Sequence, residues 1–230
     1  MALFALVPSF AQEAGEGQTL YGFVLGAGVN ADTQKYGFVK FNTSDLTKVD
    51  YLKTVTMWTP MVCAAEYLDG KIYAYTVDWD TDFGGYSSSA FEVYDATTFK
   101  SESSVNRSSE QRVLDIAYDY TTNTMYALAE DAVSTKETTG ATSLCIVDLA
   151  TGKLTRVGSP DIPQAKDGYN RLVNNTLITL AADNNGNLYA MSEYRYFFKL
   201  DKFTGKATQV GERHSLATNN QFQSMTLGTD

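Results

Sequence analysis

The chain has 230 residues, and its 18 Lys and Arg against 27 Asp and Glu give a formal net charge of −9. This acidic balance, with basic residues scattered along the chain, argues against binding to nucleic acid or to an anionic membrane surface. Hydrophobic residues make up 43% of the chain, which is enough to bury a sizeable core, and no apolar run is long enough to insert into a membrane.

The N-terminal segment contains an apolar run that ends in a small-x-small pattern at Ser9-Phe10-Ala11. Such a run is typical of the end of a signal peptide, although no basic n-region precedes it. We therefore expect residues 1–17 to be a signal-peptide remnant and linker, followed by one domain at residues 18–230. The alternative is a buried N-terminal strand. A signal peptide predicts a protein that is secreted, periplasmic or located at the cell surface.

A short cassette then recurs four times. Each copy has an apolar residue followed by Tyr, and later an apolar strand that ends in Asp or Asn. The four Asx residues are Asn42, Asp95, Asp148 and Asp201, and each follows the previous one by 53 residues. A fixed period of this length, filled with short strands, predicts a repeat fold of the β-propeller type. Because an Asx side chain bonds backbone two residues on, we interpret these four residues as turn formers rather than metal ligands.

The copy at residues 176–211 is the most complete. It has four apolar stretches separated by turns rich in Asn and Gly, which is the pattern of a four-stranded antiparallel blade. No helical periodicity interrupts it, so the fold class is all-β. Leu188-Tyr189-Ala190 and the turn from Asp201 to Lys206 resemble secreted bacterial β-propellers with repeats of the form LYA…D-x-x-TGK. The resemblance implies the fold and carries no information on function.

The two ends of the repeat array complement each other. The first copy lacks its first strand, and residues 222–227 look like a first strand without a second. Pairing residues 20–25 with residues 222–227 would complete one blade and remove two exposed sheet edges. We therefore predict a four-bladed ring closed between the N- and C-terminal strands. A fragment of a larger propeller is the alternative.

Binding residues are expected on the loops that join second to third strands and one blade to the next, because these loops share one face. Both tryptophans fall there, together with Tyr and Arg residues. The candidates for ligand binding are Trp58, Trp79, Tyr86, Arg112, Tyr169, Arg171 and Tyr194. Exposed aromatic rings beside polar groups suit stacking on sugar rings or docking of a protein partner. The alternative is that they cap the blades and cover the core rim.

Calcium is the one metal for which the sequence offers candidate ligands. Asp78, Asp80 and Asp82 alternate in one loop, and calcium prefers several hard oxygen ligands. Phe83 and Ser89 stand where an EF-hand needs Gly and Glu, so that motif is excluded, and a solvated acidic loop is the alternative. Because the chain has a single histidine, His214, it lacks a His-rich metal site. No other cofactor is indicated.

Catalytic motifs are absent from the sequence, although carboxylates occur on the inner strands. A glycan lyase or glycosidase needs two carboxyl groups about 5–10 Å apart, and Glu66 and Asp115 are candidates that no motif pairs. Asp115 is placed near the propeller axis with Cys63, and both Cys63 and Cys145 are expected to be free thiols. The leading hypothesis is an exported, non-catalytic module that binds a protein or glycan. An enzyme and a structural spacer of a larger surface protein are the alternatives.

Overall fold

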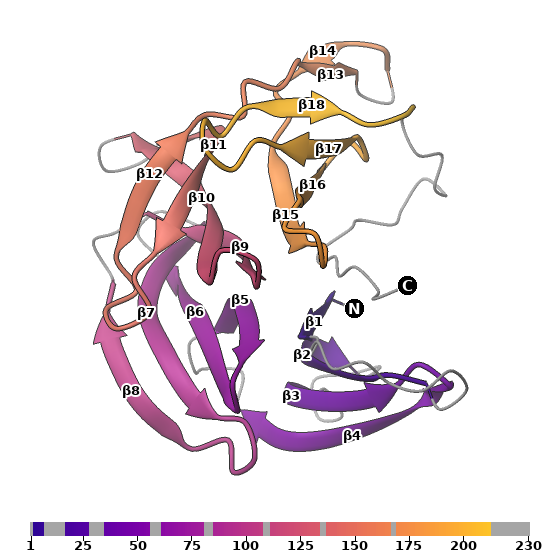
Figure 1. Ribbon diagram of the computed structural model, residues 1–230, viewed down its shortest axis with the longest axis vertical. Helices are drawn as coiled ribbons and strands as arrows, with labels where there is room; N and C mark the ends of the chain where they lie inside the picture. The colour runs from indigo at the N-terminus through magenta and orange to yellow at the C-terminus, as the bar shows by residue number, and fades with distance from the viewer. Residues whose placement is uncertain are drawn as a thin grey trace.

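The computed structural model describes residues 2–6, 17–27, 35–55, 61–80, 85–107, 111–133, 137–166 and 169–212, and within these ranges every regular element is a β-strand. Four antiparallel sheets of four strands each are arranged around a common axis (Figure 1). This confirms the predicted all-β propeller with four blades. A two-stranded hairpin comes between the third and fourth sheets in the chain and lies near β18 (Ala207–Gln209) at the outer side of the fourth. In the part of the chain that the structure describes, no helix is long and apolar enough to cross a membrane.

Each blade follows the chain order from the innermost strand to the outermost strand. Blade 1 contains β1 (Ala2–Leu6), β2 (Thr19–Ala27), β3 (Lys35–Asn42) and β4 (Asp45–Val55). Blade 2 contains β5 (Met61–Leu68), β6 (Lys71–Asp80), β7 (Gly85–Asp95) and β8 (Ser101–Asn106). Blade 3 contains β9 (Val113–Asp119), β10 (Thr124–Val133), β11 (Glu137–Val147) and β12 (Leu154–Gly158). Blade 4 contains β15 (Leu177–Ala182), β16 (Leu188–Ser192), β17 (Phe197–Leu200) and β18 (Ala207–Gln209), and the hairpin consists of β13 (Ala165–Lys166) and β14 (Leu172–Val173).

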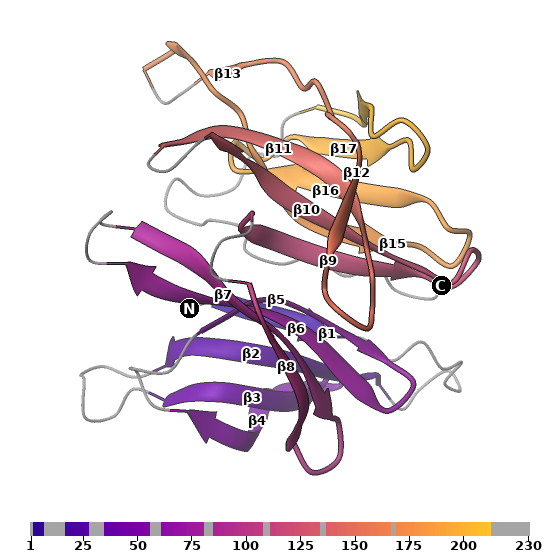
Figure 2. The same ribbon diagram turned by 90° about the vertical axis from the view of Figure 1, so that its left-hand side faces the viewer.

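This topology creates two different faces. The turns from first to second and from third to fourth strands lie on one face, which we call the turn face. The connections from second to third strands and from blade to blade lie on the other, which we call the loop face. In Figure 2 the ends of β6 and β10 and the hairpin with β13 lie on the left, on the loop face.

The core is divided into three hydrophobic clusters, one in each seam between consecutive blades. Phe23 and Phe38 of blade 1 meet edge to face, with ring centroids 5.1 Å apart, in the first seam. Phe91 of blade 2 packs in the second seam, and Phe198 of blade 4 in the third. Each of these phenylalanines is fully buried, which stabilises the fold by about 1.5–3 kcal/mol per side chain.

The first strand of blade 1 comes from the N-terminal segment. β1 pairs antiparallel with β2, from Ala2 opposite Leu25 to Leu6 opposite Tyr21. The sequence prediction placed residues 222–227 at this edge, and those residues lie outside the described part of the chain. The edge of β2 is already occupied by β1, so the blade is completed differently from the prediction. The physical reason is that the run Ala-Leu-Phe-Ala-Leu is apolar and free of Gly and Pro, which suits a strand as well as a leader.

The predicted Asx turns are present. Oδ1 of Asp95 accepts hydrogen bonds from the backbone N of Thr97 and Thr98, at 3.0 and 2.6 Å. Asp148 and Asp201 open turns with the same two bonds. Turn formation therefore accounts for these acidic residues, as the repeat position indicated. Cys63 and Cys145 are both free thiols, also as predicted.

Candidate functional site

The clearest candidate surface on the loop face is the tip of the β13–β14 hairpin. Tyr169 is 83% exposed there, and the guanidinium carbon of Arg171 lies 5.2 Å from the centre of its ring. Leu172, the first residue of β14, is 64% exposed. A cation held over an aromatic face fixes the ring without burying it. The tip therefore presents an exposed aromatic ring with a positive charge beside it, and both residues belong to the predicted set.

The other predicted aromatic residues are placed at the ends of strands or fall outside the described part. Trp79 on β6 and Tyr86 on β7 are cross-strand partners, so the hairpin register brings these two positions side by side. Tyr194 is half-buried in the turn between β16 and β17. Trp58 lies outside the described residues. The structure thus brings Trp79 and Tyr86 together and leaves Tyr169 on a separate hairpin.

Arg112 forms an ion pair with a residue that the sequence did not single out. Its Nη2 donates to Oε1 of Glu130, which is buried at the loop-face end of β10. The same two residues are also joined through the backbone, because the N–H of Glu130 donates to the carbonyl oxygen of Arg112 at 2.9 Å. Removing one partner of a buried pair leaves an uncompensated charge, so Arg112 contributes to the rim of blade 3 whatever else it contacts.

Two carboxyl groups lie on the inner strands and link neighbouring blades. Glu66 on β5 accepts the N–H of Tyr67 at 3.1 Å and the N–H of Tyr118 in blade 3 at 3.3 Å. Asp115 on β9 repeats this pattern with the N–H of Ile116 at 3.0 Å and the N–H of Leu180 in blade 4 at 2.7 Å. The N–H groups on the free edge of each inner strand need partners, and these carboxyl groups provide them.

Burial raises the pKa of both groups. The pKa of Glu66 rises to about 8, and the Coulomb repulsion of Asp115 adds to the effect of burial. The pKa of Asp115 lies well above its ordinary value because burial outweighs its two backbone hydrogen bonds. Burial also raises the pKa of the Cys63 thiol to about 12, so this cysteine is not a reactive thiolate. The pairing of Glu66 with Asp115 could not be seen in the sequence.

The predicted calcium residues are only partly described. Asp78 is exposed on β6 opposite Ser87, Asp80 ends the same strand, and Asp82 lies outside the described residues. Among the residues that the structure describes, no group of three or more His, Cys, Asp or Glu side chains is arranged to hold a metal ion. Calcium binding in this loop stays a prediction.

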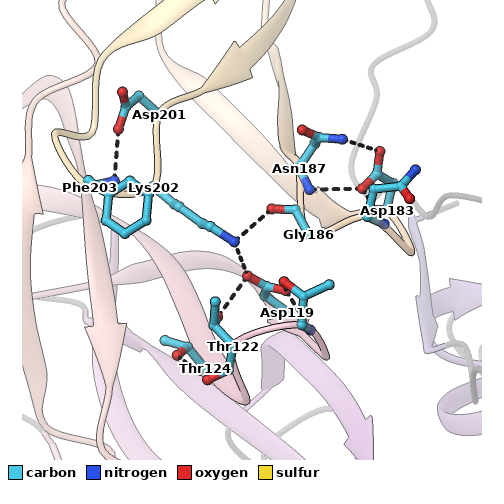
Figure 3. A network of polar contacts seen from close by, with 11 residues as sticks. Asp119, Thr122, Thr124, Asp183, Gly186, Asn187, Asp201, Lys202 and Phe203 are labelled. Carbon is cyan, nitrogen blue, oxygen red and sulfur yellow. Dashed lines mark hydrogen bonds and ion pairs between the residues drawn. The ribbon is translucent and has the colours of Figure 1, made fainter.

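A polar network on the turn face joins blades 3 and 4 (Figure 3). The fully buried carboxylate of Asp119, at the end of β9, accepts hydrogen bonds from Lys202 Nζ at 2.6 Å and from Thr122 Oγ1 at 2.7 Å. Lys202 also donates to the carbonyl oxygen of Gly186 at 3.1 Å. Burial alone would raise the pKa of Asp119, but the bonds from Lys202 and the threonines lower it to about 2. This network fixes the third seam.

No family model matches the chain, and no curated protein matches it. Solved structures do match it. The chain is similar to exo-β-1,3-galactanase from Phanerochaete chrysosporium, crystallised with β-1,3-galactotriose, at 11% identity and a TM-score of 0.55 over 91% of this chain and 50% of that one. A Bacteroides thetaiotaomicron protein of unknown function matches at 12% identity and a TM-score of 0.44, over 95% of this chain and 63% of that one. Raptor from Chaetomium thermophilum matches at 12% identity and a TM-score of 0.43, over 87% of this chain and 17% of that one.

These likenesses concern the fold alone. The chain spans half of the galactanase and less than two thirds of the Bacteroides protein. At such low identity, the residues that bind or react in one protein are not carried over to the other.

Proposed function

We propose that this chain is an exported, non-catalytic propeller module that binds a glycan through its loop face. The observation that carries the proposal is the tip of the β13–β14 hairpin, where Arg171 holds the highly exposed ring of Tyr169. An aromatic ring that is already ordered loses little conformational entropy when a sugar or side chain stacks on it. Trp79 and Tyr86, adjacent in register at the end of another loop-face hairpin, add a second pair of aromatic positions.

The test is glycan-array binding, with β-1,3-galactotriose as the first soluble probe because the galactanase of similar fold was crystallised with it. Tyr169→Ala should weaken binding by about 1–3 kcal/mol, or roughly tenfold or more, at an unchanged melting temperature. Phe203→Ala is the matched control, since Phe203 is 80% exposed in a turn-face turn. Binding only to extracellular proteins would replace the glycan with a protein partner. If neither kind of array gives a hit, the module is better described as a spacer.

A glycosidase is the second candidate, because Glu66 and Asp115 lie close enough for the charge of Asp115 to raise the pKa of Glu66. Glycoside hydrolysis uses two carboxyl groups with different roles, a protonated acid whose pKa is raised and an ionised carboxylate that acts as base or nucleophile. Both groups accept backbone hydrogen bonds across a seam, however, which favours a structural role for them. Release of reducing sugar from a β-1,3-galactan, abolished in Glu66→Gln, would establish the enzyme. If the parent protein releases no reducing sugar, the glycosidase hypothesis is rejected.

A further inference from the structure

Tyrosines from three blades gather at the turn-face end of the first two seams. Tyr21 lies near the start of β2 in blade 1, and Tyr67 lies near the end of β5 in blade 2; both of these strand ends are on the turn face. Tyr118 and Tyr120 lie at the end of β9 in blade 3 and directly after it. We call these four residues the tyrosine cluster. It lies on the opposite face from the hairpin tip with Tyr169.

Contacts between the rings hold the cluster together across both seams. The rings of Tyr21 and Tyr67 are nearly parallel, with centroids 6.0 Å apart. Tyr120 donates a hydrogen bond to the carbonyl oxygen of Tyr67 at 3.4 Å, and its ring meets that of Tyr118 edge to face at 4.8 Å. The phenol of Tyr118 donates to Oδ1 of Asn123 at 3.4 Å. The rings are therefore positioned before any ligand arrives, which lowers the entropy lost on binding.

The cluster is open to solvent and negative at its rim. Tyr120 is 43% exposed, and the other three rings are half-buried. Asp69, exposed in the turn between β5 and β6, lies near Tyr118, and its charge adds to burial in raising the pKa of that phenol. Lys71, two residues after Asp69, is paired with Glu102 at 2.9 Å. Lys202 is paired at 2.6 Å with Asp119, the residue between Tyr118 and Tyr120. An anionic ligand would therefore meet aromatic faces and the carboxylate of Asp69, while both of these cations are already paired with carboxylates.

We propose that the tyrosine cluster is a second binding site, independent of the loop face, and that it takes a neutral sugar ring. Tyrosine combines an apolar face, on which the C–H side of a sugar stacks, with a hydroxyl at its tip. The carboxylate of Asp69 accepts hydrogen bonds from sugar hydroxyls, and charge-assisted bonds of this kind are the stronger ones. The four rings come from three blades, with the stack of Tyr21 on Tyr67 across the first seam and the Tyr120 hydrogen bond across the second, so binding at this site also ties the seams together.

A protein partner fits this surface less well than a sugar does. A stable protein interface covers about 800 Å² on each side around an apolar centre. Of the other large exposed hydrophobic residues in the described chain, Leu46 lies at the start of β4 and Phe203 in the turn between β17 and β18, so neither is on the strand ends that carry the cluster. The cluster offers rings tipped with hydroxyl groups, which suits a small amphipathic ligand.

The experiment uses the full chain with ¹³C-labelled tyrosine rings and nuclear magnetic resonance. Single Tyr→Phe variants assign the signals of Tyr120, Tyr67 and Tyr169. The probes are β-1,3-galactotriose, cellotriose and maltotriose, titrated one at a time. We expect saturable shifts of the Tyr120 and Tyr67 signals with at least one probe. A site-resolved readout separates this proposal from the loop-face proposal, because Tyr169 reports the hairpin tip and Tyr120 reports the cluster.

Variants then test the chemistry with the same probe. Tyr120→Ser should weaken binding at the cluster roughly tenfold or more, whereas Tyr120→Phe, which keeps the stacking face, should change it by about threefold at most. Phe203→Ser, an equivalent change elsewhere on the turn face, should leave affinity unchanged. If Tyr120→Ser lowers the melting temperature by several degrees, Asp69→Asn decides instead, since it alters one exposed carboxylate and should also weaken binding.

Three results would overturn the proposal. The first is that no trisaccharide shifts the signals of the cluster, even where Tyr169 responds. The second is equal weakening by Tyr120→Ser and Phe203→Ser, which indicates non-specific contact. The third is a saturable shift with a trimethyllysine peptide and none with the sugars, which would make the site an aromatic cage for a cation.

Discussion

The turn face and the loop face relate differently to the 53-residue period of the chain. On the turn face, Asp95, Asp148 and Asp201 open turns with the same backbone bonds. On the loop face, the described connections have little in common. Blades 3 and 4 are joined through the β13–β14 hairpin, while β16 and β17 are joined by a short turn. The periodic Asx residues therefore serve turns, and on the loop face ligand contacts are to be sought among residues that depart from the period.

One turn-face position shows how strictly the period is kept. Four residues after each Asx residue of blades 2, 3 and 4 stand Phe99, Gly152 and Gly205, with φ values of 53°, 66° and 76°. The backbone conformation is the same although one residue is a phenylalanine. Phe99 is buried in the first seam, and its carbonyl oxygen accepts a hydrogen bond from Lys53 of blade 1 at 2.9 Å. Packing against the neighbouring blade offsets the strain of a left-handed phenylalanine.

The largest effect is expected where the turn face locks a seam. Asp119→Ala removes a carboxylate with no exposed side-chain surface and leaves the ammonium of Lys202 without its partner. Breaking a buried ion pair in this way typically destabilises a protein by about 3–5 kcal/mol, which urea unfolding measures directly. Asp201→Ala, in an exposed Asx turn, is the control and should lose much less. Equal losses for both variants would show that turn formation, and not the seam, dominates the stability of this face.

A smaller effect is expected at Gly152. A Cβ atom added there would collide with the side chain of Phe91 in blade 2, and the φ of +66° disfavours any residue with a Cβ. Left-handed strain and overpacking together suggest that Gly152→Ala costs about 3 kcal/mol. Gly70→Ala is matched in φ, at +79°, but its Cβ would meet nothing within 4 Å, so about 1–2 kcal/mol is expected. Chemical denaturation of the two variants separates strain from seam packing, and identical losses would contradict the seam contribution.

A pH-dependent effect is expected at the axis. The pKa of Glu66 is about 8 in the folded protein against an ordinary value of 4.5, so the folded state holds the proton more tightly. The stabilisation from this group is full below pH 4.5 and is lost as the pH rises toward 8. Glu66→Gln removes the titration, so the stability of the variant relative to the parent should be better at pH 8 than at pH 5. Unfolding free energies at both values test this, and a difference that does not change with pH would contradict it.

The sequence predicted those features that local chemistry determines. Asp95, Asp148 and Asp201 could be interpreted as turn formers because an Asx turn involves residues only two or three apart. Asp119 and Lys202 are 83 residues apart, and nothing near either one signals the other. The carboxyl groups of Glu66 and Asp115 likewise bind backbone in the next blade, 52 and 65 residues away. Contacts across seams depend on how the blades are rotated against each other, which the repeat pattern does not specify.

The candidate sites divide in the same way. Tyr169 and Arg171 were predicted from their loop position, and the structure brings them together. The tyrosine cluster was missed, because binding residues were expected on the loop face and the tyrosines at the turn-face ends of the strands were not singled out. Tyr67 and Tyr120 are 53 residues apart, so they keep the period, and blade 4, whose inner strand ends in Ala182, lacks a tyrosine near this position. The period therefore did not mark them as a site, and the ring contact between blades is visible only in the structure.

The smallest expected effect belongs to the acidic loop at the end of β6. Asp78 and Asp80 are two residues apart on that strand, and Asp82 follows. If the loop binds calcium, the ion stabilises only the folded state, and a calcium concentration ten times the Kd adds about 1.4 kcal/mol, or roughly 3–5 °C in Tm. Calcium at millimolar concentration should therefore raise the Tm of the parent, and the triple change of Asp78, Asp80 and Asp82 to Asn should abolish the shift.

The control is Asp50→Asn, which changes an exposed carboxylate on β4 and should keep the calcium-dependent rise in Tm. An unchanged Tm in the parent would leave the loop as a solvated acidic segment and confine ligand binding to the aromatic surfaces.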